Sequence, residues 1–432
     1  MRKEQVTIGL LGLGTVGRGV YRVLCDNGAL ITRRLGVPLE IKKILVRDLQ
    51  KDRGLYIPPS LLTTNPSEVL DDPEIDIIVE VMGGMEPTLS YVLQGLRNGK
   101  SVITANKDMV AAYGRELFAA AQRTQRDFLF EASVAGGIPI IRVLKECLVA
   151  NYIQELIGIV NGTTNYILSK MTLAKVDFAQ ALAEAQALGY AEQDPTNDID
   201  GFDAARKMAI LGSIAFNSRI SLEDVYVEGI RNIKPADIQY AAELGYVIKL
   251  LGIAKNTPDG VDVRVHPALL PCTHPLAAVN DVFNAVFVKG DAVGEAMFFG
   301  RGAGELPTAS AVVADIVYAA RNLIHNVPGM LSCTCFEDRH LRPIEAVPNK
   351  YYLRLVVLDR PGVLAQIAFI FGEHEVSLAS VIQKSAAEGK AEIVLVTHRV
   401  AEGNLRRALK LIGELPVVDA ICSVIRVEGE ED

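Results

Sequence analysis

The sequence predicts an α/β protein of three consecutive parts: a doubly wound, mostly parallel sheet, a mixed α+β part, and a compact βαββαβ part. Three observations support this fold class. An apolar strand at the N-terminus runs into a glycine-rich turn and a helix, apolar strands then alternate with helices as far as Phe130, and a different strand and helix order follows Pro348. Apolar strands that alternate with helices are typical of a parallel sheet covered on both faces.

The first strand, Val6 to Leu11, leads directly into the glycine-rich turn and a helix that we expect to reach Leu24. A GxGxxG pattern is weak alone but much stronger between a strand and a helix. Its glycines permit a tight turn and let the backbone approach a pyrophosphate at the helix N-terminus. The sequence therefore predicts a Rossmann-like dinucleotide site formed by Gly12, Leu13, Gly14, Thr15, Val16 and Gly17.

The end of the second strand indicates which dinucleotide is bound. An acid there would hold a ribose hydroxyl, whereas a base can accept a 2′-phosphate. Arg47 comes first, before Asp48 and Lys51, which favours NADP; because an arginine can also crowd the ribose, NAD stays open. The other elements expected in this part are strands at Leu39 to Val46, Ile75 to Val81, Ser101 to Thr104 and Phe128 to Phe130, and helices at Thr88 to Asn98 and Met109 to Thr124.

Composition limits the class of protein. A chain of 432 residues, half of them hydrophobic, should form two or three domains with real cores. We expect no membrane span, because no run of about 18 apolar residues is present, and the net charge of −8 argues against a nucleic-acid partner. The six cysteines are scattered, and Cys333 and Cys335 lack the two-residue gap of a zinc or redox motif, so we expect reduced cysteines in a cytoplasmic protein.

The segment from Ala187 to Lys207 is unusually acidic. A helix then starts, and its i, i+4 spacing puts Asp203 and Lys207 on one face. The segment could hold a cationic ligand and move a proton beside it, or it could be a solvated loop with a surface ion pair. A calcium loop is excluded, because Thr196 and Lys207 occupy its first and twelfth ligand positions. The five carboxylates are Glu192, Asp194, Asp198, Asp200 and Asp203.

Five motifs follow one another in the first 330 residues: Gly12 to Gly17, Thr104 to Lys107, Glu131 to Pro139, Gly158 to Asn165 and Leu188 to Lys207. Taken in order, they resemble the motifs of homoserine dehydrogenase. The resemblance implies reversible reduction of L-aspartate 4-semialdehyde to L-homoserine with NADPH or NADH, in threonine, methionine and isoleucine biosynthesis. Because no domain precedes the strand at Val6, we expect a monofunctional enzyme rather than a kinase–dehydrogenase.

The resemblance assigns the proton transfer to Lys207, with Asp203 orienting a water or the substrate hydroxyl. A carbonyl oxygen that gains a hydride becomes an alkoxide and needs a nearby proton donor. For this role we expect burial or cationic neighbours to lower the pKa of Lys207. The alternative for both residues is an exposed ion pair.

The substrate is an amino acid, and its ammonium needs carboxylates, for which the resemblance implies Glu192 and Asp198. Some relatives carry an aspartate where this chain has Asn197, so the charge at that position is missing. We therefore expect Asp198 to contribute more to binding of the ammonium.

Three further residues are candidates for binding. Thr163 follows a glycine in a loop, where its hydroxyl could meet the substrate or cap a helix. Thr104 ends a strand and Lys107 follows it, where open α/β sheets bind ligands, so Lys107 could meet the nicotinamide, the substrate carboxylate or both.

A glycine-rich turn follows Glu131. In the family this segment binds a monovalent cation, usually sodium, and the resemblance implies that Glu131 and the carbonyls of Val134, Gly136 and Ile138 are its ligands. Oxygen ligands suit a hard cation. The residues alone would indicate only a turn.

The second part should mix strands with helices and supply oligomer contacts, giving a homodimer or homotetramer. We expect strands at Tyr152 to Val160, Val261 to Ala268 and Asn284 to Lys289, and helices at Phe178 to Leu188 and Ile238 to Ile253. The flexible run Gly300 to Gly304 could close over the cofactor, with Gly302 nearest, and a helix from Thr308 to Leu323 would return to the first part. The expected domains are therefore residues 1–137 plus 305–330 for the dinucleotide and 138–304 for the substrate.

After a linker at residues 331–349, the pattern from 350 to 429 resembles an ACT domain, the ferredoxin-like module that binds amino acids. The run Leu358 to Leu364 contains a glycine that would expose backbone N–H groups to a ligand carboxylate. The resemblance implies an end product such as threonine as effector; a purely dimerising domain is the alternative. The expected elements are strands at Tyr351 to Leu358, Val376 to Gln383, Ala391 to Thr397 and Ala420 to Val427, with a helix after Leu364 and another at Leu405 to Leu415.

Two other functions fit parts of the pattern. A 2-hydroxy-acid dehydrogenase with an ACT domain would need a histidine paired with an acid, which His266, His274 and His325 do not provide. A non-catalytic amino-acid sensor that kept a dinucleotide fold would need neither Asp203 nor Lys207.

Overall fold

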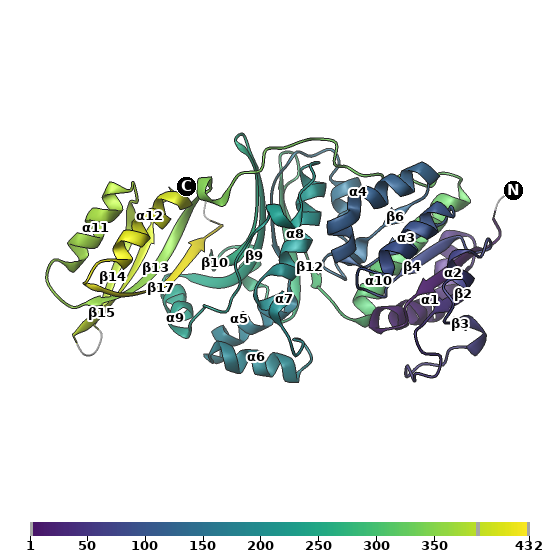
Figure 1. Ribbon diagram of the computed structural model, residues 1–432, viewed down its shortest axis with the longest axis horizontal. Helices are drawn as coiled ribbons and strands as arrows, with labels where there is room; N and C mark the ends of the chain where they lie inside the picture. The colour runs from purple at the N-terminus through teal and green to yellow at the C-terminus, as the bar shows by residue number, and fades with distance from the viewer. Residues whose placement is uncertain (1–2, 386–388, 430–432) are drawn as a thin grey trace. The chain divides into compact units, whose positions relative to one another are not determined.

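A computed structural model describes residues 3–385 and 389–429. The chain forms two compact units (Figure 1). The first unit contains residues 1–156, 206–223 and 284–338, and the second contains residues 157–205, 224–283 and 339–432. Strand β7 (Ile153–Ile159) and helix α8 (Phe202–Ala215) each have residues in both units.

The first unit is built on a six-stranded parallel sheet of order β3-β2-β1-β4-β5-β6. This order reverses direction between β1 and β4, where doubly wound sheets bind their ligands. The strands are β1 (Val6–Leu11), β2 (Leu39–Leu45), β3 (Leu62–Thr63), β4 (Ile77–Glu80), β5 (Ser101–Thr104) and β6 (Phe128–Leu129). The helices are α1 (Thr15–Leu35), α2 (Ser67–Leu70), α3 (Thr88–Arg97), α4 (Lys107–Thr124) and α10 (Glu305–Ile324).

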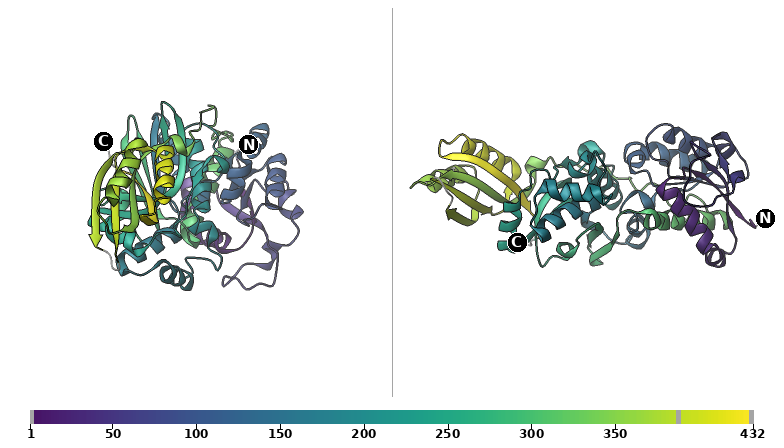
Figure 2. Two further views of the ribbon diagram at one scale, coloured as in Figure 1. Left: turned by 60° about the vertical axis from the view of Figure 1, so that its left-hand side comes forward. Right: turned by 90° about the horizontal axis from the view of Figure 1, so that it is seen from below.

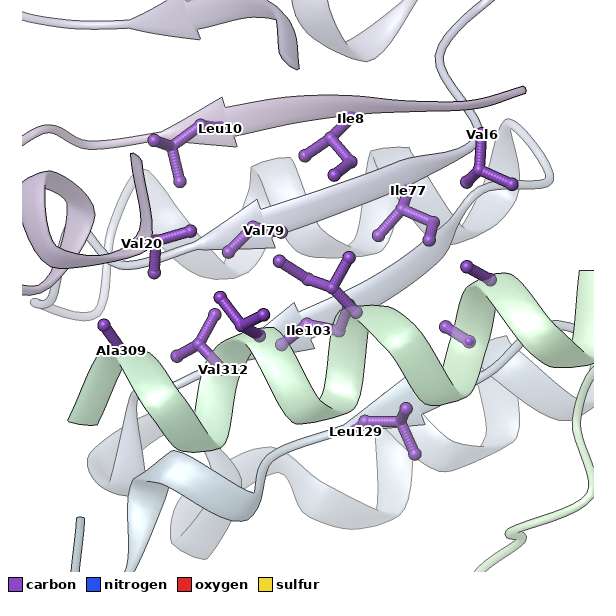
Figure 3. Close-up of a cluster of buried hydrophobic side chains, with 14 of the residues drawn as sticks. Val6, Ile8, Leu10, Val20, Ile77, Val79, Ile103, Leu129, Ala309 and Val312 are labelled. Carbon is purple, nitrogen blue, oxygen red and sulfur yellow. The ribbon is translucent and has the colours of Figure 1, made fainter. Parts of the chain in front are cut away.

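Helices α1 and α10 pack together on one face of this sheet, although about 270 residues separate them (Figures 1 and 2). Alternate strand residues such as Ile8, Ile77 and Val79 meet Val312 of α10 in the core (Figure 3). The other side chains face the opposite side, where Gly95 of α3 leaves room for Ile78. The predicted return of the chain to the first part is therefore confirmed by α10.

The second unit contains a mixed sheet of order β9-β10-β17-β13-β15-β14. The βαββαβ module is confirmed as β13, α11, β14, β15, α12 and β17, with α11 and α12 covering one face. The strands are β8 (Tyr226–Val227), β9 (Tyr246–Thr257), β10 (Gly260–Pro271), β13 (Pro348–Leu358), β14 (Leu378–Ser385), β15 (Lys390–Thr397), β16 (Val400–Ala401) and β17 (Val418–Val427). The helices are α5 (Gly162–Ala174), α6 (Phe178–Ala187), α7 (Thr196–Ile199), α9 (Pro235–Glu243), α11 (Val363–Glu373) and α12 (Glu402–Gly413).

The predicted helix from Ile238 to Ile253 is wrong. Helix α9 ends at Glu243, Gly245 takes a φ of 84°, and β9 then pairs residue by residue with β10. A strand buried on both faces is a continuous apolar run, which periodicity cannot separate from a buried helix. The seven residues from Ile248 to Ala254 are all buried, and Lys249 is the one charged residue among them, so their pattern does not alternate as in a one-sided strand.

The glycine-rich run from Gly300 is only partly a loop. Gly300 and Arg301 end strand β12 (Gly294–Arg301), which the sequence did not indicate and which pairs with β11 (Phe283–Gly290). Among the described residues, no helix is long and apolar enough to cross a membrane.

Candidate active site

A cavity of about 540 Å³ lies at the carboxyl ends of β1, β2 and β4, at the point where the sheet reverses its strand order. Its wall contains the glycine-rich turn, the segment after β2 and the loop after β4. The volume is in the range of small-molecule and cofactor sites. The residues that line it include Gly12, Leu13, Gly14, Arg47, Asp48, Lys51, Arg53, Met82, Gly83, Gly84, Pro87, Thr88 and Tyr91.

The three glycines of the turn have different roles. Gly12 has a φ of 99°, and a Cβ there would lie 3.0 Å from the Met82 backbone. A Cβ on Gly17 would lie 2.3 Å from the Gly12 carbonyl oxygen, so both positions require glycine for the turn itself. A Cβ on Gly14 would meet nothing within 4 Å, because this residue faces the cavity at the N-cap of α1.

The N-terminus of α1 suits an anion. The helix has no side-chain cap and no acidic residue in its first turn. Its first N–H groups and the positive end of its dipole therefore face the cavity without a competing carboxylate.

The segment after β2 carries exposed basic residues at the cavity. Arg47 and Lys51 are both exposed there. Arg53, which the sequence analysis did not single out, donates to the carbonyls of Asp48 at 2.6 Å and Lys51 at 2.7 Å and so shapes this segment. The sequence does not indicate these hydrogen bonds between Arg53 and the backbone of its own loop.

Glu80, at the end of β4, is another residue that the sequence analysis missed. It is fully buried, and burial raises the pKa of its carboxyl group. Its oxygens accept hydrogen bonds from the N–H groups of Met82 and Gly83 and from the Thr104 hydroxyl at 2.5 Å. The Thr104 hydroxyl is thus directed at Glu80, and together they fix the loop that lines the cavity.

Lys107 and Lys207 are each next in sequence to one residue of an ion pair. Lys107 is the first residue of α4, which Asn106 caps by accepting from the Met109 N–H at 3.1 Å. The next residue, Asp108, pairs with Arg206 of α8 at 2.8 Å. The first unit therefore brings the start of α4 beside the α8 residue that precedes Lys207, and both lysines are half-buried.

In the second unit, Asn161 joins two of the five carboxylates. Its Nδ2 donates to Asp198 at 2.7 Å and to Asp203 at 2.9 Å. Its Oδ1 caps α5 by accepting from the Thr164 N–H at 2.8 Å. Asp203 is buried and lies one helical turn before Lys207 on α8.

The remaining carboxylates of the acidic segment differ in their contacts. Asp194 accepts from the N–H and hydroxyl of Thr196 and so shapes the start of α7, while Asp200 pairs with Arg231. Glu192 is exposed. The acidic segment is therefore neither uniformly solvated nor uniformly a ligand site.

The expected loop at Thr163 is wrong. Thr163 lies in the first turn of α5, because Asn161 caps the helix immediately before it. Its hydroxyl donates to the Tyr190 carbonyl at 2.6 Å, which ties the acidic segment to α5.

The turn after Glu131 concentrates buried negative charge. The Glu131 carboxylate accepts from the N–H groups of Ile141 and Arg142, and its own N–H donates to Asp315. Burial raises the pKa of Glu131, and it raises the pKa of Asp315 to about 7 despite an ion pair with Arg142 at 2.6 Å. The Arg142 guanidinium thus pairs with Asp315, whereas Glu131 is held by backbone N–H groups.

The backbone of this turn bends at two consecutive residues. Ala135 and Gly136 have φ angles of 54° and 40°, so the chain turns sharply where carbonyl ligands were predicted. A Cβ on Gly136 would lie 2.4 Å from the Gly302 carbonyl oxygen, and one on Gly302 would overlap the Asn284 side chain. Gly302 is therefore packed against the turn after Glu131.

Sequence and structure comparisons agree over the whole chain. The model described as the homoserine dehydrogenase NAD binding domain matches residues 12–131, the homoserine dehydrogenase model matches 139–317, and the ACT domain model matches 351–417. Homoserine dehydrogenase of Bacillus subtilis is 45% identical over 428 residues, covering 99% of both chains.

Solved structures give the same result. A homoserine dehydrogenase from Thiobacillus denitrificans superposes with a TM-score of 0.94 at 47% identity, covering 99% of each chain. A hyperthermophilic archaeal homoserine dehydrogenase in complex with NADPH superposes with a TM-score of 0.62 at 29% identity, covering 73% of this chain and 97% of that one. The chain is an oxidoreductase that binds a nicotinamide dinucleotide, and it belongs to the homoserine dehydrogenase family.

Proposed function

We propose that this chain interconverts L-homoserine and L-aspartate 4-semialdehyde with NADP as its preferred cofactor, on the route to threonine, methionine and isoleucine. The observation that carries the proposed site is that Asn161 joins Asp198 to Asp203, which lies in the first turn of the helix that carries Lys207. The nicotinamide, when bound, supplies or accepts the hydride.

Lys207 is the proposed proton carrier. In the reductive direction its ammonium donates to the oxygen that becomes an alkoxide, and in the oxidative direction its amine takes the hydroxyl proton. Asp203, one turn earlier on α8, orients the hydroxyl or a water for this transfer. The Asn161 amide holds the Asp203 carboxylate in place by donating to its Oδ2.

The charged ends of the substrate need groups of opposite sign. Asp198 and Glu192 bind the substrate ammonium, and Lys107 binds its carboxylate. Asn161 sets the position of Asp198, and Thr163 holds the acidic segment through Tyr190. Asn197 adds no charge, so Asp198 carries the greater part of this interaction.

For the cofactor, the pyrophosphate lies at the start of α1, over Gly14, with Leu13, Thr15 and Val16 completing the turn. Arg47 and Lys51 bind the 2′-phosphate, which supports NADP over NAD. Thr104 acts by fixing the loop after β4, and Lys107 and Gly302 lie on the nicotinamide side.

A monovalent cation, with sodium as the first candidate, would be held by Glu131 and the carbonyls of Val134, Gly136 and Ile138. It would offset the excess of buried negative charge at Glu131 and Asp315. Its proposed role is structural, because no step of the proton transfer uses it.

The ACT domain binds an amino-acid effector, and we propose threonine. The φ of 86° at Gly362 and the absence of a side-chain cap leave N–H groups at the start of α11 for its carboxylate. Two sets of contacts connect the ACT sheet to the rest of the second unit. Buried Asp237 of α9 accepts from Arg354 at 2.7 Å and from Ser423 at 2.7 Å.

The second set leads towards the acidic segment. Arg426 of β17 donates to Glu228 at 2.8 Å, and Ile230, two residues later, donates to the Ile199 carbonyl of α7 at 2.8 Å. Residues 226–231 therefore connect the ACT sheet with the helix that carries Asp198. This connection gives an effector a physical route to the substrate carboxylate.

We further propose the domain boundaries and assembly expected from the sequence: residues 1–137 plus 305–330, 138–304, a linker at 331–349, and the ACT domain at 350–429, in a homodimer or homotetramer.

The test of the cofactor proposal is the ratio of kcat/KM for NADP and NAD with L-homoserine, measured for the full chain and for Arg47→Ala. NADP should be preferred, and the variant should lose about tenfold or more of that preference. A ratio that Arg47→Ala leaves unchanged would contradict the role of Arg47. Adding threonine to the same assay tests the effector.

A further inference from the structure

Outside the active site, the segment after α10 presents two thiols in an unusual setting. Cys333 and Cys335 are free and half-buried, with only Thr334 between them. The Cys333 sulfur accepts from the Arg219 guanidinium, whose Nη2 lies at 3.7 Å, and the Cys335 thiol lies 4.0 Å from the Ser213 carbonyl oxygen. A guanidinium directed at the sulfur stabilises its thiolate.

Charged groups from two other elements face this sulfur. Lys145 donates to the Ser332 carbonyl at 2.8 Å and stacks over the Phe118 ring at 5.0 Å, and burial lowers the pKa of its amine. Arg219 follows the end of α8. The thiol of Cys335, acting as donor, lowers the pKa of Cys333, and the same interaction raises the pKa of Cys335. Cys333 is thus the thiol that loses its proton and acts as the nucleophile, and Cys335 keeps its proton.

The thiols also border a small cavity of about 40 Å³ between α4 and α8. Val110 and Gly114 of α4 line it, as do Ser213 and Ile214 of α8. The same two helices carry Lys107 and Lys207. A covalent bond formed at the thiols would therefore change the packing of α4 and α8, the helices that position both lysines.

We propose that Cys333 and Cys335 form a peroxide-sensitive pair, in which Cys333 is the attacking sulfur and Cys335 the resolving thiol. The Cys333 thiolate attacks one oxygen of hydrogen peroxide, the O–O bond breaks, and the sulfur is oxidised to a sulfenic acid while hydroxide leaves and takes a proton as water. The Cys335 sulfur then attacks the Cys333 sulfur. The S–S bond forms, the S–O bond breaks, and the Cys335 proton and the leaving hydroxide make a second water.

This pair does not follow from the sequence spacing, since a one-residue gap is not the usual redox motif. It follows from the guanidinium, the turn and the amine that surround Cys333. The proposal does not depend on the proposed cofactor preference or substrate contacts, because its main readout is the mass of one peptide.

The experiment treats the full chain with hydrogen peroxide, blocks the remaining thiols with iodoacetamide and measures the peptide that contains residues 333–335. We expect this peptide to be two hydrogens lighter and not alkylated, and Cys335→Ser to stop at a sulfenic acid that dimedone labels on Cys333. Before oxidation, iodoacetamide at pH 6 should modify Cys333 about tenfold faster than the exposed Cys25, because an ordinary thiol is almost fully protonated there.

Arg219→Leu should slow the oxidation and Arg219→Lys should restore most of the rate, whereas a merely structural arginine would change stability without this pattern. Turnover should fall as the disulfide forms and return with dithiothreitol, and Cys333→Ser should not show this loss. A peptide that stays fully alkylated after peroxide would overturn the proposal. A disulfide that leaves turnover unchanged would overturn the effect on α4 and α8.

Discussion

Replacing Asn161 by alanine separates the two tasks of this side chain when it is compared with a second variant. Asn161 caps α5 through its Oδ1 and holds Asp198 and Asp203 through its Nδ2. The alanine variant removes both tasks at once. Asn161→Asp keeps an oxygen for the cap but places a third carboxylate against the other two, so it removes only the second task.

The structure sets the size of each effect. Loss of the cap should lower the stability of the folded chain by about 1 kcal/mol. A hydrogen bond to a charged group contributes about 1.5–3 kcal/mol, so releasing the carboxylate that holds the substrate should lower kcat/KM for homoserine by about 10- to 150-fold. Most of this loss should appear as a higher KM if Asp198 acts in binding, and as a lower kcat if Asp203 acts in the reaction.

The assay is steady-state kinetics with homoserine, paired with thermal unfolding of each variant. Asp177→Ala is the matched control, because it removes the cap of α6, an exposed side chain that accepts from the Gln180 N–H at 2.8 Å, without touching the acidic segment. The control should lose stability and keep kcat/KM. If Asn161→Asp were as active as the unmodified chain, the organising role of Asn161 would be refuted.

Three further changes test other parts of the account. Gly14→Val should keep the unfolding temperature but weaken cofactor binding by tenfold or more, about 1.4 kcal/mol. Gly17→Ala should weaken binding and also lower the unfolding temperature, because its Cβ meets the Gly12 carbonyl. Calorimetric titration with NADPH and thermal unfolding together distinguish the two variants. Sodium chloride should raise the unfolding temperature above that in tetramethylammonium chloride at equal ionic strength, and Glu131→Gln should abolish the difference. Since burial raises the pKa of Glu131, the sodium effect should be present above that pKa and disappear as acid protonates the carboxylate; equal unfolding temperatures in both salts would count against the cation. Arg354→Met should destabilise the chain by about 3 kcal/mol, because it leaves buried Asp237 without its cation, and adding Asp237→Leu should recover part of this. Lys390→Met, which breaks an exposed pair with Asp419, should cost less than about 1 kcal/mol in the same denaturant titration, and similar losses for both would argue against burial as the cause.

The parts of the fold that the sequence predicted share a local cause. Strand β5 and the start of β1 were placed correctly because short apolar runs there are bounded by turn residues, and the glycine turn was placed because only glycine fits Gly12 and Gly17. The helix expected through Ile253 failed because the buried run of β9 lacks the alternation of a one-sided strand, and the pairing with β10 that decides between helix and strand is not local.

The candidate site shows the same division. Its high charge singled out the acidic segment, but charge alone could not distinguish the roles of its five carboxylates. Their separate tasks depend on Asn161, Arg231 and Thr196, and Asn161 and Arg231 lie more than 30 residues from the carboxylates they contact. Glu80 could have been found from the sequence, because a carboxylate at the end of an otherwise apolar strand indicates a buried acceptor. The assignments of site residues to substrate, cofactor and cation stay predictions.

The most direct test of the account is the activity of Lys207→Ala, measured as homoserine-dependent absorbance of reduced nicotinamide, beside NADPH binding by the same variant. The account predicts that turnover falls at least about 100-fold while NADPH binding changes little, because Lys207 moves a proton and the cofactor cavity lies around the glycine turn. Turnover within a few-fold of the unmodified chain, or loss of NADPH binding together with turnover, would contradict it.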